Sequence, residues 1–346
     1  MPVDRALIVG HGSIGKRHLR LARQLLPQAD IRVLRHQIAT TVPEHADGCF
    51  TTLNEAIAFA PQIAAIASPA PFHLAAATPL ARAGVHLLVE KPLSSSPAGV
   101  MELLTTAQEH KIVLLAGYNL RYLPSLQKFR QLLTENVIGT VLSVRCEIGQ
   151  YLPTWRPDTD YRETVSAREH LGGGALLELS HELDYLRWIF GEIEWVMAWL
   201  GRQSRLEIDV EDTAHLVLGF KPNPNGLRLV GNLNMDFVRQ DSVRLCTAIG
   251  EAGSLRWNGL HNTIEQYASS SGKWCEVSRH ETQRDDSYRA EWRHFIACIE
   301  GDETPLVSGE AGLAVLKIID AARRASASGC ITYTEAAFGA SLKEGP

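Results

Sequence analysis

The stretch Arg5–Gly15 has the sequence RALIVGHGSIG, an apolar run that passes directly into three glycines. The run Arg5–Val9 is short and almost wholly apolar, which is typical of a strand covered on both faces in a parallel sheet. Gly10, Gly12 and Gly15 then form the pattern G-x-G-x-x-G, and a helical pattern follows. Strand, glycine turn and helix together predict the start of a dinucleotide-binding unit.

Each glycine of this turn has a physical task. The first makes the tight turn, the second lets the backbone approach a pyrophosphate, and the third lets helix and strand pack closely. A glycine-rich turn can also be purely structural, but here a second strand, Ile31–Leu34, closes a βαβ unit of about thirty residues. We therefore expect a pyrophosphate to bind at the helix N-terminus, along Gly10, Gly12, Ser13, Ile14 and Gly15.

The end of the second strand bears on the choice of cofactor. An Asp or Glu about twenty residues after the glycines would hold the ribose hydroxyls of NAD. This chain has Arg35 and His36 there. A guanidinium suits a 2′-phosphate and cannot accept a hydrogen bond from a hydroxyl, so we expect NAD(P) with NADP favoured. The alternative is that Arg35 is a solvated residue at a strand end.

Strands and helices continue to alternate up to residue 118, which predicts a doubly wound parallel Rossmann sheet of roughly six strands. The strand Val85–Val89 delivers Glu90, Lys91 and Pro92 to its carboxyl end. Ligands of open α/β sheets lie outside those ends. Lys91 is therefore expected to face the cofactor cleft, although a lysine at a strand end can also be a simple surface residue.

From Val141 onward the apolar period changes to two, as in a strand with one buried face. A turn-rich segment at 221–226 joins two further alternating runs, and the helical pattern returns near the end of the chain. These patterns predict an α+β domain with a largely antiparallel open sheet and helices on one side. We expect a dinucleotide-binding domain over residues 1–118 and a second domain over 119–346 for substrate binding and oligomerisation.

The composition is that of an ordinary globular protein, with 45% hydrophobic residues, 21% charged residues and a formal net charge of −5. It favours neither nucleic-acid binding nor membrane insertion, because no basic surface is indicated and the apolar runs are short. The N-terminus leaves no room for a signal peptide, so we expect a cytoplasmic protein. The six cysteines are scattered without metal-ligand spacing, and no metal site is expected.

Three separated motifs resemble those of a known family. Gly10–Gly15, then Glu90-Lys91-Pro92, and later the segment 172–191 (GGGALLELSHELDYLRWIFG) resemble the glucose–fructose oxidoreductase / inositol dehydrogenase / rhizopine catabolism (Gfo/Idh/MocA) family. Glu-Lys-Pro is weak alone, but its combination in order with His181-x-x-Asp184 is specific. The resemblance covers nearly the whole chain and implies an oxidoreductase that transfers hydride between a nicotinamide and a sugar-like hydroxyl or carbonyl.

The resemblance also implies roles for individual residues. Lys91 would lie beside the nicotinamide and the reacting oxygen, and the peptide bond before Pro92 is often cis in the family. His181 would be the general acid/base, and Asp184 would orient or contact the substrate. Further residues would line the site: Tyr118 and Arg121 in the cleft wall, and Ser68, Pro69, His73 and Glu90 beside the cofactor.

One departure from the family concerns a carboxylate near the histidine. The common pattern has an Asp four residues before it, whereas this chain has Glu178 three residues before His181. On one continuous helix either spacing would keep both side chains on the same face. Glu178 is therefore a possible substrate-binding residue rather than an assigned one.

Oxidation of an alcohol requires a base for the hydroxyl proton in addition to the nicotinamide. His181 and Lys91 are the two nitrogen bases that fit, and we expect them to act as one proton-handling unit. Without the resemblance, His181 could equally be a satisfied core histidine. The segment 151–162 carries Trp155, Arg156 and Tyr161, residue types that bind sugars and acids, and we expect it to be a loop over the substrate.

Two other functions remain open from the sequence. The chain could be a non-catalytic sensor or regulator that kept the dinucleotide site, or an enzyme that uses a tightly bound NAD for a redox-neutral sugar reaction. The resemblance further suggests a sugar, nucleotide sugar or sugar acid as substrate. It also suggests a homo-oligomer, a dimer or tetramer, paired through the open face of the second sheet.

Overall fold

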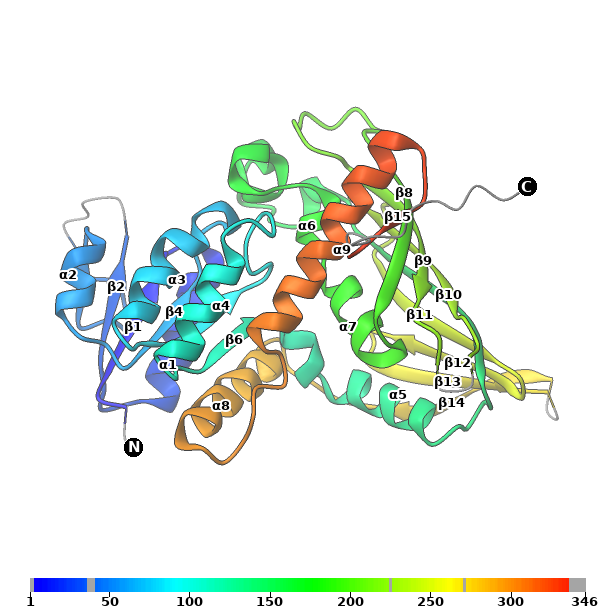
Figure 1. Ribbon diagram of the computed structural model, residues 1–346, viewed down its shortest axis with the longest axis horizontal. Helices are drawn as coiled ribbons and strands as arrows, with labels where there is room; N and C mark the ends of the chain where they lie inside the picture. Colours follow the sequence, from blue (N-terminus) through cyan, green and yellow to red (C-terminus); the bar gives the residue numbers. More distant parts are fainter. Residues whose placement is uncertain (1–2, 36–40, 224–225, 270–271, 336–346) are drawn as a thin grey trace, which may run out of the picture.

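The computed structural model describes residues 3–35, 41–223, 226–269 and 272–335. These residues form a six-stranded sheet and a nine-stranded sheet, each with helices packed on it (Figure 1). The first sheet, blue to cyan, and the second, green to yellow, lie side by side, and α9 (Gly309–Ser328) runs between them.

The first sheet is entirely parallel, with the strand order β3-β2-β1-β4-β5-β6. Its central strands are buried on both faces, as the apolar runs predicted. The order reverses at β1 and β4, the position where doubly wound sheets bind their ligands. The strands are β1 (Arg5–Val9), β2 (Asp30–Leu34), β3 (Gly48–Phe50), β4 (Ile63–Ile66), β5 (His86–Glu90) and β6 (Leu114–Gly117).

Helices connect these strands and cover the sheet. They are α1 (Ser13–Leu25), α2 (Leu53–Ala58), α3 (His73–Arg82) and α4 (Val100–Glu109), with a short 3-10 turn η1 (Ala70–Phe72). The Rossmann architecture expected from the sequence is confirmed. The first helix begins at Ser13, within the glycine pattern.

The second sheet is mixed but mostly antiparallel, in the order β14-β13-β12-β11-β7-β10-β9-β8-β15. Only β7 and β10 pair in parallel. The expected α+β fold with a largely antiparallel sheet is therefore also confirmed. The strands are β7 (Val141–Gly149), β8 (Ile193–Gly201), β9 (Thr213–Phe220), β10 (Val230–Asp236), β11 (Val243–Gly250), β12 (Gly253–Asn258), β13 (Thr263–Ala268), β14 (Lys273–Arg279) and β15 (Thr332–Tyr333).

Helices cover one face of this sheet. In β10, Leu233 and Met235 point to the buried face, while Asn232 and Asn234 are exposed on the other. The covering helices are α5 (Pro124–Thr134), α6 (Ala175–Glu178), α7 (His181–Phe190) and α9, and several 3-10 turns precede them: η2 (Asn119–Tyr122), η3 (Leu152–Thr154), η4 (Tyr161–Glu163), η5 (Val165–Ala167) and η6 (Glu169–Leu171).

The helix α8 (Asp286–Glu300) returns to the first sheet. Its Trp292 and Phe295 are fully buried in the same apolar cluster as Ala6 and Ile8 of β1. The expected domain boundary at residue 118 stays a prediction. A second domain made of all residues after 118 would, however, include α8, which packs on the first sheet. A late segment of the chain completes the core of the dinucleotide-binding half.

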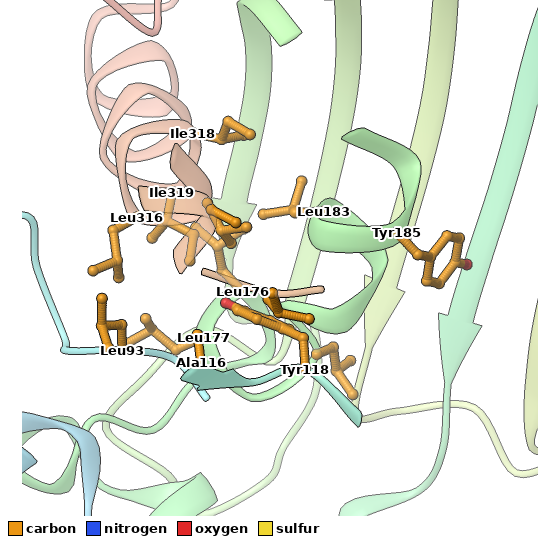
Figure 2. Close-up of a cluster of buried hydrophobic side chains, with 14 of the residues drawn as sticks. Leu93, Ala116, Tyr118, Leu176, Leu177, Leu183, Tyr185, Leu316, Ile318 and Ile319 are labelled. Atoms are coloured by element: carbon orange, nitrogen blue, oxygen red, sulfur yellow. The ribbon is translucent and has the colours of Figure 1, made fainter. Parts of the chain in front are cut away.

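An apolar cluster contains buried side chains from both halves of the molecule (Figure 2). Gly312 of α9 allows close contact, because a Cβ there would lie 3.1 Å from the Leu93 side chain. The cluster therefore fixes Lys91, which lies two residues before Leu93, relative to α6 and α7. The labelled members are Leu93, Ala116, Tyr118, Leu176, Leu177, Leu183, Tyr185, Leu316, Ile318 and Ile319.

Several features bear on the kind of protein. In the described residues, no helix combines the length and the apolar character needed to cross a membrane. The same residues contain no group of three His, Cys, Asp or Glu side chains that could hold a metal ion. The six cysteines are free thiols.

Candidate active site

The first and third glycines of the turn are required by packing. Gly10 has φ +95°, and a Cβ there would lie 2.8 Å from the carbonyl oxygen of Ala67. At Gly15 a Cβ would lie 2.2 Å from the carbonyl oxygen of Gly10. Any side chain would therefore push α1 away from β1 and β4.

The second glycine faces open space at the helix N-terminus. A Cβ on Gly12 would meet no atom within 4 Å. Gly12 is the N-cap of α1, where no side chain caps the helix and no acidic residue lies in the first turn. The first N–H groups, including those of Ser13 and Ile14, are thus left for an anion, which the helix dipole also favours. The turn fits the pyrophosphate of a dinucleotide.

Arg35 lies just after β2, with its backbone N–H bonded to the carbonyl of Phe50 and its side chain bonded to the carbonyl of Thr41. Burial and the positive charges of Lys16 and Arg35 lower the pKa of His11. Arg35 and Lys16 thus lie near the glycine turn as two cations. His36, the second predicted residue here, lies outside the described residues.

Lys91 follows β5 at the carboxyl edge of the first sheet. The Lys91–Pro92 peptide bond is cis, as the resemblance implied. The lysine backbone N–H donates to the Glu90 carboxylate at 3.0 Å, and its Nζ donates to the backbone carbonyl of Glu178 at 2.8 Å. Lys91 therefore bridges the two halves of the molecule.

Glu90 was expected beside the cofactor, but its carboxylate points into the protein. Glu90 Oε1, the oxygen that does not bond to Lys91, lies 2.8 Å from Nε2 of His18 on α1. Nδ1 of the same histidine accepts from the indole N–H of Trp292 on α8 at 2.9 Å. Since Nδ1 accepts, Nε2 carries the proton and donates to Glu90. Glu90 thus holds the backbone of Lys91 in place and is a positioning residue.

The helical segment before His181 is broken, whereas a helix face shared by Glu178 and His181 requires one continuous helix. α6 ends at Glu178 and α7 begins at His181. The backbone N–H of Glu182 bonds to the carbonyl of Leu179 at 3.3 Å instead of that of Glu178. The Glu178 carbonyl is consequently left to accept from Lys91, so the break creates the contact between the two halves.

The break between α6 and α7 also separates Glu178 from His181, contrary to the expectation of a shared helix face. Glu178 and His181 do not share one helix face, because two non-helical residues separate them. The Glu178 carboxylate instead accepts from Ser166 Oγ at 3.0 Å. In this structure Glu178 contributes to the site through its backbone carbonyl.

His181 is the first residue of α7, in the second half of the molecule. Its Nδ1 is buried without a hydrogen-bond partner among the described residues, whereas Nε2 is not buried and makes no hydrogen bond there. Burial, with the charges of Lys91 and Arg244, holds the pKa of His181 well below 6.5. The imidazole is therefore neutral near pH 7 and can accept a proton.

Asp184 and Arg121 do not face the cleft, contrary to expectation. Arg121 is 4% exposed and Asp184 is 1% exposed. Arg121 donates to both carboxylate oxygens, from Nε at 2.9 Å and from Nη2 at 2.6 Å, and its Nη1 donates to the carbonyl of Leu306. The pair links η2 to α7 and to the segment before α9. The polar atoms of both side chains that form these hydrogen bonds lie in the protein interior.

Tyr118 is also fully buried, so it supports the site without lining it. Its ring packs edge-on against the His181 ring with centroids 5.6 Å apart, and its hydroxyl lies 3.5 Å from Ser180 Oγ. A buried aromatic ring in this position fixes the orientation of the imidazole.

Residues of the expected substrate loop line a pocket of about 10 Å³, the space of a single water molecule. Its lining consists of Leu152, Trp155, Arg156, Tyr161, Thr164 and Ser166. That the loop covers a substrate stays a prediction. Trp155 packs edge-on against Phe237, with ring centroids 5.2 Å apart. Because Ser166 bonds to Glu178 and Glu178 accepts from Lys91, the pocket is connected to the lysine by two hydrogen bonds.

Ser68, Pro69 and His73 lie at the exit of β4. Ser68 Oγ is buried without a partner among the described residues, next to Ala67, the residue that contacts Gly10. An orphaned hydroxyl at this point fits a bound cofactor group. His73 is 1% exposed, with Nε2 at 2.6 Å from the Ser68 carbonyl and Nδ1 at 3.1 Å from the Pro92 carbonyl. His73 thus joins the loops after β4 and β5, and Pro69 precedes η1.

Four residues of this region were not predicted from the sequence: His18, Ser166, Glu182 and Arg244. Arg244 had the clearest signal, since it alternates in β11 with Cys246 and Ala248, which are buried. That signal was hidden because the intervening Val243, Leu245 and Ile249 are apolar too. Glu182 is fully buried beside His181, which no local pattern indicates.

Comparison with protein families matches both halves of the chain. The model described as "Oxidoreductase family, NAD-binding Rossmann fold" (GFO_IDH_MocA) matches residues 5–118. The model described as "Oxidoreductase family, C-terminal alpha/beta domain" matches residues 130–333. Together they account for most of the chain.

Individual proteins resemble the chain at low sequence identity. Myo-inositol 2-dehydrogenase of Thermotoga maritima is 27% identical over 271 residues, 70% of this chain and 71% of that protein. A levoglucosan dehydrogenase solved with NADH has a TM-score of 0.82 and 20% identity, covering 96% of this chain and 99% of that one. The WlbA dehydrogenase of Bordetella pertussis, solved with NADH and UDP-GlcNAcA, has a TM-score of 0.77 and 22% identity over 95% and 98%.

Proposed function

The chain belongs to the Gfo/Idh/MocA family of oxidoreductases, as its motifs indicated, and from this premise we propose that it is an NAD(P)-dependent sugar dehydrogenase. The substrate would be a sugar, a nucleotide sugar or a sugar acid. The similarity to an inositol dehydrogenase, a levoglucosan dehydrogenase and a nucleotide-sugar dehydrogenase supports this class.

One observation carries the proposal. Lys91 from the first half and His181 from the second lie within electrostatic reach of each other, and Lys91 Nζ is held by the carbonyl of Glu178, three residues before His181. Two independent motifs of the sequence are thus neighbours in the structure. Lys91 follows β5 at the carboxyl edge of the Rossmann sheet, which supports a site there because dinucleotides bind at that edge.

The residues suggest a division of tasks. The glycine turn and the N-terminus of α1 would hold the pyrophosphate, and the bound nicotinamide would accept or return the hydride. His181 Nε2 would take the hydroxyl proton, because the imidazole is neutral and this nitrogen is open. The Lys91 ammonium would donate to the same oxygen and stabilise negative charge as the proton leaves.

The direct test is a panel of neutral sugars, sugar acids and nucleotide sugars, each supplied with NAD and with NADP. Formation of reduced nicotinamide is followed by its absorbance. Substrate-dependent reduction by at least one of these classes is expected. If the chain binds NAD(P) but turns over none of these substrates, the result favours the alternative of a non-catalytic sensor or regulator. Product formed without added cofactor, by protein purified with bound NAD, would favour the redox-neutral reaction.

We further propose that NADP is the preferred cofactor, because Arg35 directly follows β2 and, like Lys16 of α1, acts on His11 of the glycine turn as a positive charge. Arg35→Ala is expected to lower kcat/KM for NADP about 10- to 100-fold, the range of a charge-assisted hydrogen bond. Initial rates with each cofactor test this, with Arg82→Ala, an exposed arginine of α3 paired with Glu102, as control. A wild-type preference for NAD that the substitution leaves intact would contradict the proposal, and the NADH-bound neighbours keep this outcome open.

We propose that two copies pair through the uncovered face of the second sheet. Met197 and Trp199 of β8 are 45% and 47% exposed, on the face opposite the buried Val196. Replacing both by Glu is expected to convert an oligomer into a monomer, because two buried charges per copy would be unpaired. Light scattering measures the mass, and Val42→Glu, an exposed residue of the first half, is the control. A monomeric wild type would refute the pairing. The cytoplasmic location and the absence of nucleic-acid binding stay predictions.

A further inference from the structure

Arg244 is a largely buried arginine of strand β11, and the proposed proton transfer does not involve it. It lies near the start of β11, where its neighbour Val243 pairs with Gly149 at the end of β7. The substrate loop leaves β7 at this same end. Arg244 therefore stands under the substrate loop, on the face of the sheet covered by α7.

A buried carboxylate holds one edge of its guanidinium. Arg244 Nε donates to Glu182 Oε1 at 2.8 Å, and the Glu182 side chain is fully buried on α7, beside His181. The contact uses Nε alone, because the second carboxylate oxygen of Glu182 is buried without a partner among the described residues. The bond to Glu182 thus fixes the orientation of the guanidinium from its Nε edge.

The other edge of the guanidinium is free. Neither Nη nitrogen of Arg244 makes a hydrogen bond within the described residues, and neither belongs to the buried atoms that lack a partner. Both therefore reach solvent, in a side chain that is only 20% exposed. A rigid, half-desolvated pair of N–H donors matches the two oxygens of a carboxylate or phosphate.

Two cations and two carboxylates surround this part of the site. Lys91 and Arg244 both act on His181 as positive charges. Glu182 pairs with Arg244, and Glu90 acts on Lys91 as a negative charge. The charges are thus balanced, so a substrate anion would be bound by the two free Nη donors of Arg244 and not by an excess of positive charge.

We propose that Arg244, fixed by Glu182, is the subsite for an anionic group carried by the sugar, a carboxylate or a phosphate. This inference rests on the proposed function and narrows its substrate class to acidic sugars. Glu182 is a positioning residue for the guanidinium. The subsite lies beside His181, so the anionic group sits close to the carbon that reacts.

The test compares probes that differ only in charge: D-glucuronate and D-glucose 6-phosphate, each against D-glucose, and UDP-glucuronate against UDP-glucose. Binding to the NADH-loaded protein is followed by NADH fluorescence, which requires no turnover. The wild type is expected to bind at least one anionic probe about 10- to 100-fold more tightly than its neutral partner. The carboxylate and phosphate arms distinguish the two groups.

Arg244→Gln is expected to abolish this preference. Because that change leaves Glu182 buried without a partner and can destabilise the fold, the double variant Arg244→Gln/Glu182→Gln is measured as well. Arg228→Gln removes an exposed arginine paired with Glu194 near the opposite end of the sheet, and it should keep the wild-type ratio. A wild type without preference for anions, or a preference that survives in the double variant, overturns the inference. Failure of the proposed function looks different, since it would appear as loss of turnover in the wild type whatever the charge of the probe.

Discussion

Lys91→Met is expected to lower kcat about 100- to 10,000-fold, the range in which a positioned proton donor or acceptor contributes. The substitution removes the only ammonium that the described structure places between Glu178 and His181. Methionine preserves the length and the apolar stem of the side chain. The dissociation constant of NAD(P)H should change little, because the glycine turn and not Lys91 holds the pyrophosphate.

The measurement combines steady-state rates with fluorescence titration of NADH. Lys128→Met, which removes an exposed lysine of α5 whose ammonium donates to Gln131, should retain wild-type kcat. His181→Asn should lose a comparable factor. If the two residues act as one unit, the double variant will be little worse than the poorer single one. A Lys91→Met enzyme with wild-type kcat would remove the basis of the proposed mechanism.

The pH profile gives an independent readout. Since burial and two positive neighbours lower the pKa of His181, the imidazole stays neutral as the pH falls below 6.5, and oxidation should persist there. Removing the Lys91 charge takes away one of these causes, so the pKa of His181 should rise. The acid limb of kcat/KM in Lys91→Met should therefore move to higher pH than in the wild type. An unmoved limb would mean that the two groups do not share the site.

The first half of the fold could be predicted from the sequence because its signals are local. A buried strand needs only a short apolar run, and the glycine turn at Gly10–Gly15 has steric demands that no other residue meets. Lys91 could be placed for the same reason, since it directly follows a predicted strand of a parallel sheet. The order of those strands then brings their carboxyl ends together.

The break before His181 could not be predicted in this way. Residues 175–190 contain no Pro or Gly between Ala175 and Phe190, and helical periodicity runs through Leu179 and Ser180. The break is compensated by a tertiary contact, the bond from Lys91 Nζ to the Glu178 carbonyl, with a partner 87 residues away. Local propensity is overridden where a distant side chain satisfies the backbone.

The pairing of Arg121 with Asp184 shows a second limit. Each residue matched a family position associated with the cleft, and charged residues near a site suggest substrate contact. In the structure, 63 positions separate two side chains that neutralise each other in the interior. Whether a charge meets substrate or another charge depends on the packing of η2 against α7, which neither local sequence contains.

Arg121→Met is accordingly expected to act on stability. Removing one partner of a buried pair leaves the other charge uncompensated, which costs about 3–5 kcal/mol. The loss should appear in urea and thermal unfolding, since Asp184 is 1% exposed and has no route to water. Arg162→Met, in an exposed pair with Asp160 and Glu207, should change the unfolding midpoint little.

The double variant Arg121→Met/Asp184→Leu separates the two roles. Apolar residues of similar volume can replace a buried ion pair at little cost, so the double variant should recover most of the stability lost in Arg121→Met. If the pair serves only the fold, that variant should also recover the KM for the substrate found in the panel. Restored stability with a KM that stays raised more than about tenfold would mean that Arg121 or Asp184 contacts substrate after all, since such a change corresponds to the loss of a hydrogen bond to a charged group.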